Sequence, residues 1–261
     1  MKRIALLAAL TLAACNSGTT GNESAAGDGG SATAAVPSIK PKTVWVISPD
    51  HINIRGDFYP AEKPKAIILL FHQADSSKDE YATIAPRLVA AGYSAMAIDQ
   101  RSGGSMFGTN ETIKNLKHKA EMADAENDLV GAVNWARPFG KPIILWGSSY
   151  SASLVFDVAN QFPGEVKAVL AFSPGEYFPD AHQVGRAAAT LAVPAYITSS
   201  SDPDEIAKAK AIAERVPAGK AEQYVPATGV HGSSTLIAAK DPKGAEANWA
   251  SALAFLKKVA P

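Results

Sequence analysis

The sequence predicts a doubly wound α/β domain with a mostly parallel sheet, an antiparallel N-terminal hairpin and no large cap. Two observations predict this class. Apolar runs of strand length alternate with segments whose apolar residues fall at helical spacing. Two of the runs, 65–72 and 93–99, are almost continuously apolar, which is typical of parallel strands that are buried on both faces. With 47% hydrophobic and 19% charged residues, the chain has a globular composition.

The elements are expected in the following order. Strands over 43–48 and 51–59 form the hairpin, because β-branched, aromatic and alternating residues fill them. Further strands are expected over 65–72, 93–99, 142–146, 166–172, 195–198 and 223–225, and helices over about 81–91, 118–137, 152–161, 206–215 and 245–259. The segment between Phe172 and Pro194 has room for a small helix but not for a large cap.

The first fourteen residues predict a signal peptide that is removed. Lys2 and Arg3 give a positive start, and the apolar stretch 4–12 is too short to span a bilayer. The run Leu-Ala-Ala-Cys that ends at Cys15 resembles the lipobox of bacterial lipoproteins. That resemblance implies that Cys15 becomes the mature N-terminus and carries lipid, palmitate included. The alternative is an ordinary secretory signal with a chance cysteine.

Residues 15–41 are predicted to be the lipidated cysteine and a flexible tether, and residues 42–261 the folded domain. Gly, Ser, Thr, Ala and Asn dominate the tether. We expect a lipid-anchored protein of the bacterial cell envelope, outside the cytoplasm, and in a diderm host Asn16 favours the outer membrane. The 25 basic and 25 acidic residues balance, so nucleic acid is not an expected partner. The oligomeric state is not predicted.

The segment 147–151 predicts a serine nucleophile at Ser149. A buried strand precedes the segment and a helix follows it, which is the setting of a nucleophile elbow. Such a turn needs small residues two before and two after the nucleophile, and Gly147 and Ser151 meet this need, although Ser151 stands where the pattern has glycine. The alternative is a serine-rich N-cap of the next helix.

His231 is the expected general base. In the chain order that accompanies such an elbow, the acid and then the histidine follow the serine, and His231 lies in a glycine-flanked loop between the last strand and the last helix. His182 also follows Ser149, but its connecting segment indicates a surface residue. We expect no metal and no cofactor.

Asp202 is the expected acid, because it directly follows the strand over 195–198. It could instead be the N-cap of a helix that opens with Pro203. Asp204 and Glu176 are the alternative acids. Asp204 and the neighbouring Glu205 also fit the first turn of a helix, where acids interact well with the helix dipole.

The expected oxyanion hole consists of the Tyr150 N–H and an N–H from Gln73 or Ala74, in the loop after an early buried strand. Tyr177 and Phe178 are possible substrate-pocket residues. His72 is a further pocket candidate, although packing and hydrogen bonding under the loop suit it better.

By its motifs the chain resembles the dienelactone-hydrolase-like branch of the α/β-hydrolases over roughly residues 43–260. The motifs are L-L-F-H-Q-A, A-G-Y-S-A-M-A-I-D-Q-R-S-G-G, L-W-G-S-S-Y-S-A-S, P-A-Y-I-T-S-S-S-D and G-V-H-G-S-S-T-L. The resemblance implies metal-free cleavage of small or polymeric esters, lactones or thioesters through an acyl-enzyme. Dienelactone hydrolases proper have cysteine where this chain has Ser149. An acyltransferase, a serine peptidase and a non-catalytic ligand-binding lipoprotein are the alternatives.

Overall fold

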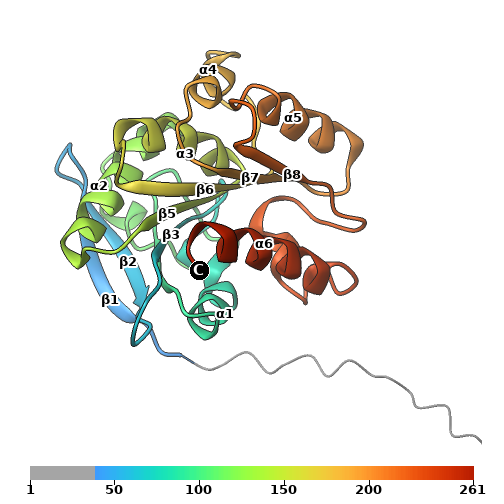
Figure 1. Cartoon of the computed structure of the whole chain (residues 1–261). Helices are drawn as coiled ribbons and strands as arrows, with labels where there is room; N and C mark the ends of the chain where they lie inside the picture. The colour runs from blue at the N-terminus through green and yellow to red at the C-terminus, as the bar shows by residue number, and fades with distance from the viewer. Residues whose placement is uncertain (1–38) are drawn as a thin grey trace, which may run out of the picture. The chain divides into compact units, whose positions relative to one another are not determined.

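A computed structural model describes residues 39–261 (Figure 1). The predicted signal peptide, Cys15 and the tether up to residue 38 lie outside these residues. One sheet of eight strands runs in the order β1-β2-β4-β3-β5-β6-β7-β8. The pairs β1–β2 and β2–β4 are antiparallel, and the remaining pairs are parallel. The predicted mostly parallel sheet with an antiparallel N-terminal hairpin is therefore confirmed.

The strands lie close to their predicted ranges. They are β1 (Lys42–Ile47), β2 (Asn53–Tyr59), β3 (Ile67–Phe71), β4 (Ser94–Ile98), β5 (Ile143–Ser148), β6 (Val166–Phe172), β7 (Ala195–Thr198) and β8 (Ala221–Tyr224). The α-helices are α1 (Ile84–Ala90), α2 (Glu126–Ala136), α3 (Tyr150–Gln161), α4 (Gln183–Ala189), α5 (Pro203–Ala213) and α6 (Ala245–Val259). Short 3₁₀ helices include η1 (Lys78–Tyr81), η3 (Ala123–Ala125) and η5 (Gly232–Leu236).

Three helix starts differ from the prediction by three residues or more. Helix α1 begins at Ile84, three residues after the expected start. The helix expected to begin near residue 118 begins at Glu126, because residues 118–122 form a loop and η3 follows. Helix α5 begins at Pro203, three residues before the expected start, since Asp202 caps it. The segment from 173 to 194 carries only the seven-residue α4, as its length predicts.

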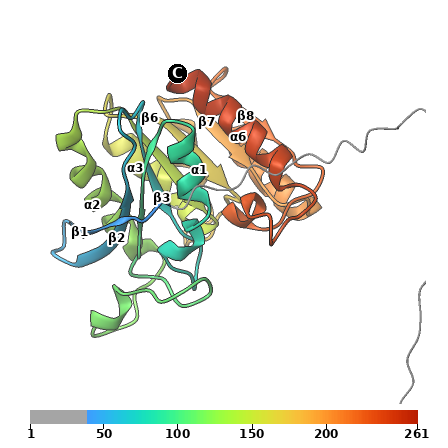
Figure 2. The same ribbon diagram turned by 90° about the horizontal axis from the view of Figure 1, so that it is seen from below.

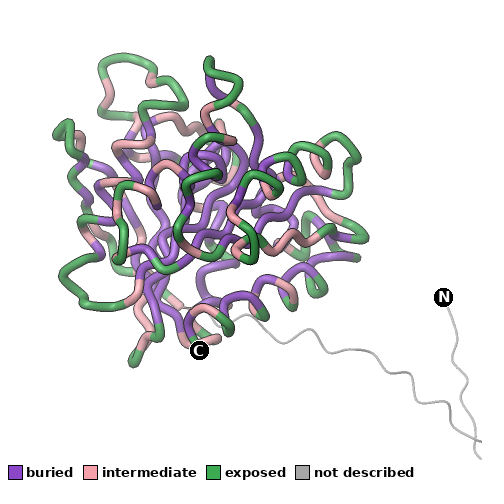
Figure 3. The backbone as a smooth tube through the Cα atoms, turned by 45° about the horizontal axis from the view of Figure 1, so that its top comes forward, coloured by how far each residue is buried: buried purple, intermediate pink, exposed green. Residues whose placement is uncertain are grey.

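The helices cover both faces of the sheet. Helices α2, α3 and α5 lie on one face and α1 and α6 on the other, as Figures 1 and 2 show. Alternate strand residues supply the two cores, since successive side chains point to opposite faces. On β3, Leu69 packs in the core under α2 and α3, and Ile68 packs in the core under α1 and α6. The central strands are buried on both faces (Figure 3), which explains their continuous apolar runs.

The parallel strands direct their carboxyl ends to one edge of the sheet. The loops after β3, β5, β6, β7 and β8 therefore meet there, which is where open α/β sheets bind ligands. Within residues 39–261, no helix combines the length and the apolar character that crossing a bilayer requires.

Candidate active site

Ser149 lies at the sharp turn between β5 and α3. Its backbone has φ 61° and ψ −124°, in the region that L-residues with a side chain rarely adopt. The Ser149 N–H donates to the Phe172 carbonyl on β6 at 2.8 Å, and the Ala152 N–H donates to the Ser149 carbonyl at 2.9 Å. These bonds hold the residue in a strained conformation, and such strain is concentrated at functional sites.

Small residues make this turn possible. A Cβ on Gly147 would lie 2.3 Å from the Ser151 carbonyl oxygen and 2.5 Å from the Ala152 nitrogen, so only glycine fits there. Ser151 is fully buried, and its hydroxyl lies within hydrogen-bond distance of the carbonyls of Phe71 and Ser148, at 3.0 and 2.9 Å. The serine that replaces the usual glycine therefore links the elbow to the end of β3.

His231 pairs with Glu205. His231 Nδ1 is 2.8 Å from Glu205 Oε1, and the two side chains are 39% and 21% exposed. The Ser173 hydroxyl donates to Glu205 Oε2 at 2.8 Å, and the Ser200 N–H donates to the same oxygen at 3.1 Å. Burial opposes ionisation of Glu205, but the hydrogen bonds from His231, Ser173 and Ser200 lower its pKa to about 2. Glu205 is thus a carboxylate at neutral pH, oriented to fix the imidazole.

The structure does not place Asp202 on His231, which corrects the predicted acid. Asp202 is the N-cap of α5, and its Oδ1 accepts the N–H groups of Asp204 and Glu205 at 2.9 and 3.2 Å. The carboxylate that caps a helix faces the helix axis rather than the neighbouring loop. Glu205, three residues later on the first turn of α5, contacts His231 instead.

Within the part of the chain that the structure describes, neither alternative acid forms a hydrogen bond or ion pair with His231. The carboxylate of Glu176 accepts the N–H groups of Val184 and Gly185 at 2.9 and 2.8 Å and so caps α4. Asp204 directs its backbone N–H to Asp202, and no hydrogen bond among residues 39–261 joins its side chain to His231. His182 is exposed at the start of α4, as predicted.

The histidine loop lies directly on the elbow. The Ser233 N–H donates to Ser148 Oγ at 2.8 Å, and the Gly232 N–H donates to Ser173 Oγ at 2.9 Å. A Cβ on Gly232 would lie 3.8 Å from the Ser149 nitrogen and 2.3 Å from Ser148 Oγ. Among the described residues, Ser149 Oγ has no hydrogen bond to His231; in unliganded enzymes such bonds often form only with substrate.

Two backbone N–H groups are candidates for an oxyanion hole. Tyr150 is the first residue of α3, so its N–H has no acceptor within the helix. Gln73, one of the two predicted partners, does not qualify, because its N–H donates to Glu80 Oε2 at 2.9 Å. The N–H of Ala74, the other predicted partner, makes no hydrogen bond within residues 39–261. The candidate oxyanion hole therefore consists of Tyr150 and Ala74.

Comparison with known sequences decides the family. Residues 62–224 match the sequence family Hydrolase_4, described as serine aminopeptidase S33. This match covers more than half of the chain. The chain belongs to the serine aminopeptidase S33 family. Its fold is that of the α/β-hydrolases.

Relatives of this S33 member are hydrolases. A monoacylglycerol lipase from Mycolicibacterium smegmatis is 28% identical over 115 residues, which are 44% of this chain and 40% of that protein. The chain therefore matches less than half the length of this curated relative. An esterase from Pyrococcus furiosus superposes with a TM-score of 0.65 at 18% identity, covering 86% of this chain and 94% of the esterase. A dienelactone hydrolase from Anabaena variabilis gives 0.67 at 16% identity, covering 85% and 100%.

The predicted pocket residues of this S33 member lie in different environments. His72 is fully buried; its Nε2 accepts the Gln100 N–H at 2.9 Å, and its Nδ1 lies 2.7 Å from the Gln73 carbonyl. Burial lowers the pKa of His72 to about 4, so the ring stays neutral and supports the loop without lining a pocket. Phe178 packs in the core and is not a pocket residue either. Tyr177 is half-buried; burial raises its pKa, and its hydroxyl donates to the Ser173 carbonyl at 2.9 Å.

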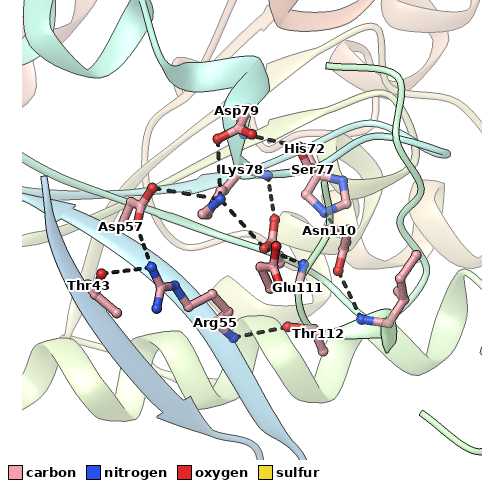
Figure 4. Close-up of polar contacts among 12 residues, drawn as sticks. Thr43, Arg55, Asp57, His72, Ser77, Lys78, Asp79, Asn110, Glu111 and Thr112 are labelled. Carbon is pink, nitrogen blue, oxygen red and sulfur yellow. Dashed lines mark hydrogen bonds and ion pairs between the residues drawn. The ribbon is translucent and has the colours of Figure 1, made fainter. Parts of the chain in front are cut away.

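An acidic cluster anchors the oxyanion loop. Figure 4 shows Lys78 of η1 beside Asp57 of β2 and Asp79, with Nζ–oxygen distances of 3.8 and 3.2 Å. Asp99, after β4, accepts the Lys78 N–H at 2.8 Å and the Glu111 N–H at 2.9 Å. These contacts fix η1 against the sheet. The other acidic residue of η1, Glu80, accepts a hydrogen bond from the Ser148 hydroxyl at the elbow.

The sequence pattern does not predict three residues of the site. It indicates only a helix-dipole role for Glu205 and assigns no role to Ser173 or Glu80. Ser173 has φ 56°, a turn conformation that no local pattern indicates. Glu80 follows Ser77 at the capping-box spacing, which suggests a local role. The Glu80 side chain instead bonds to Gln73 and Ser148. Within the described residues, no group of three or more His, Cys, Asp or Glu side chains could hold a metal ion.

Proposed function

We propose that the protein is a serine hydrolase that cleaves carboxylic esters through an acyl-enzyme intermediate. Ser149 is the nucleophile, His231 the general base and Glu205 the acid that orients it. The observation that carries this proposal is the strained backbone of Ser149 at the end of β5, beside a loop whose His231 pairs with the carboxylate of Glu205. A serine nucleophile needs a base and an oxyanion site, and this arrangement supplies candidates for both beside Ser149.

The proposed reaction has two steps. His231 Nε2 takes the Ser149 proton as Oγ attacks the ester carbonyl, and the oxygen that becomes negative lies between the N–H groups of Tyr150 and Ala74. The protonated imidazole then gives its proton to the leaving alcohol. Water, deprotonated by the same imidazole, attacks the acyl group and releases the acid and Ser149. The Glu205 carboxylate stabilises the imidazolium in both steps.

The names of the relatives favour an ester over an amide. The curated relative is a monoacylglycerol lipase, and esterases and a dienelactone hydrolase share the fold. The family description favours a second candidate, an aminopeptidase. An aminopeptidase needs an acid to bind the substrate's amine, and the acid that lies beyond the 173–175 turn, Glu176, already accepts two N–H groups of α4.

Turnover of matched substrates tests the proposal. The purified chain is expected to hydrolyse p-nitrophenyl acetate and butyrate, and Ser149→Ala is expected to reduce this to background. The matching p-nitroanilides test the peptidase candidate, and added methanol tests the acyltransferase alternative by methyl-ester formation. Binding of esters without turnover would favour a non-catalytic lipoprotein and contradict the proposal.

The proposed location is the bacterial cell envelope, outside the cytoplasm, with lipid on Cys15 as the anchor. The support comes from the lipobox-like sequence before Cys15 and the tether that follows. Two or more acyl chains give stable anchoring, whereas one gives only marginal binding. In the native host, Cys15→Ala is expected to move the protein from the membrane fraction to the soluble fraction; an unchanged distribution contradicts lipid anchoring.

A further inference from the structure

Glu80 is a buried carboxyl that joins the three loops of the site. It is 1% exposed, on the short helix η1 after the oxyanion loop. Its Oε2 accepts the Gln73 backbone N–H at 2.9 Å, and its Oε1 lies 2.7 Å from Ser148 Oγ and 3.3 Å from Gln73 Nε2. Gln73 Nε2 also lies 3.3 Å from the hydroxyl of Ser234, beyond the histidine. One carboxyl therefore contacts the oxyanion loop and the elbow, and Gln73 extends the link to the His231 loop.

Every polar neighbour of Glu80 is a donor. Ser148 Oγ accepts the Ser233 N–H at 2.8 Å, so its own proton is free to point at Glu80. The Gln73 N–H can only donate. A carboxylate accepts all of these bonds, whereas a protonated carboxyl or an amide would set a hydrogen against a donor. The hydrogen bonds around Glu80 therefore suit the charged form, whereas its burial opposes ionisation.

The charge of Glu80 has no permanent counterion. Within residues 39–261 no Lys or Arg forms an ion pair with it, and Lys78 on the same helix lies among Asp57, Asp79 and Asp99. The titratable groups that face Glu80 are His231 from the loop before η5, Tyr81 on η1 and Tyr150 on α3. His72, in the loop after β3, remains neutral. Of these groups only His231 becomes a cation in the proposed reaction, and its loop is tied to Ser148, the partner of Glu80, through the Ser233 N–H.

We propose that Glu80 is a positioning residue whose carboxylate sets the oxyanion loop against the nucleophile elbow and stabilises protonated His231 during the reaction. This inference rests on the proposed function. By holding the Gln73 N–H away from Ser149, the carboxylate leaves the next N–H, that of Ala74, facing the site. By holding Ser148, it fixes the residue before the nucleophile. Its negative charge acts together with that of Glu205 on the imidazole.

The protonation state of Glu80 then controls the rate. Burial raises the pKa of Glu80 to about 7, although hydrogen bonds from Gln73 and Ser148 oppose this rise. Below pH 7 the wild type carries a neutral carboxyl and resembles a Glu80→Gln variant. Above pH 7 only the wild type has the charge. The ratio of the wild-type kcat to the Glu80→Gln kcat is therefore expected to rise as the pH passes through about 7 and to level off above it.

The test compares wild type and Glu80→Gln with p-nitrophenyl butyrate between pH 5.5 and 9. The free energy of a hydrogen bond to a charged group corresponds to a factor of roughly 10 to 100 in a rate constant. We expect the kcat ratio to be within about threefold at pH 5.5 and at least about tenfold at pH 8.5, with KM nearly unchanged. Glu246→Gln, a surface substitution in the Arg87 ion pair, is the matched control and is expected to behave as wild type.

Three results would overturn the inference: equal kcat at pH 8.5, a ratio that does not change with pH, or an effect on KM alone. If Glu80→Gln does not fold, Ser148→Ala replaces it. That variant removes a donor that lowers the Glu80 pKa, so the rise in kcat near pH 7 should move to higher pH, and an unmoved midpoint contradicts the inference. A wild type without any ester turnover refutes the proposed function itself, whereas an active wild type with an unaffected Glu80→Gln refutes only the role of Glu80.

Discussion

Replacing Glu205 with glutamine changes one atom in the contact that orients His231. Glu205 Oε1 lies 2.8 Å from His231 Nδ1, so the imidazole carries its proton on Nδ1 and presents a lone pair on Nε2. In Glu205→Gln, the carbonyl oxygen can still accept from Ser173 and Ser200, which turns the amide NH₂ towards Nδ1. The imidazole then accepts on Nδ1 and holds its proton on Nε2, the wrong tautomer for a base.

The expected loss follows from the tautomer. An amide in place of a triad acid lowers kcat by roughly 10⁴, which is about 5 kcal/mol at about 1.4 kcal/mol per factor of ten. KM is expected to change little, because Glu205 lies behind the imidazole. Helix α5 should persist, since Asp202 still caps it.

The matched control is Asp202→Asn. Asparagine is as good an N-cap as aspartate, so α5 stays intact and kcat is expected to remain within about twofold of wild type. Steady-state hydrolysis of p-nitrophenyl butyrate at pH 8, with circular dichroism to check folding, measures both variants. A 10⁴-fold loss in Asp202→Asn together with near-normal Glu205→Gln would refute the assignment and restore Asp202 as the acid.

Three further predictions concern the framework of the site. Gly147→Ala should abolish ester turnover and destabilise the fold by at least about 2 kcal/mol in urea titrations, because its Cβ would lie 2.3 Å from the Ser151 carbonyl; wild-type stability would refute the elbow geometry. Asp128→Ala should cost roughly 3 kcal/mol, because it leaves Arg101 without its buried partner at 2.7 Å; a loss below about 1 kcal/mol would contradict this. The pKa of Glu80 is about 7 against an ordinary 4.5, so the folded state holds this proton more tightly. The free energy of unfolding should therefore fall by roughly 3 kcal/mol as the pH rises from 4.5 to 7, and Glu80→Gln should remove this slope.

The strands and the elbow could be predicted from local sequence. Buried parallel strands are continuous apolar runs, and the run 166–172 and the helix 245–259 coincide with β6 and α6. The sequence singles out Ser149 as a candidate nucleophile because its motif sits between a strand and a helix. It singles out His231 as a candidate base because this residue follows the last strand in a glycine-flanked loop. Each of these predictions depends only on residues that are close together in the sequence.

The carboxylate that pairs with His231 could not be predicted, because three residues compete within one helical turn. Asp202, Asp204 and Glu205 all follow β7, and a helix that begins at residue 203 instead of 206 changes which of them faces the histidine loop. Side-chain length decides the contact, since Glu205 reaches His231 from inside the first turn while Asp202 is used as the cap. The partners of Glu80 are equally invisible in the sequence, because Ser148 lies 68 residues away.

Active-site labelling with a fluorophosphonate tests the central claim most directly. The probe reacts only with a serine that a nearby base activates, and it needs no knowledge of the substrate. We expect wild type to gain one adduct, located on Ser149 by peptide mass spectrometry, and Ser149→Ala to gain none. An unlabelled wild type, or an adduct on another residue, would contradict the identification of Ser149 as the nucleophile.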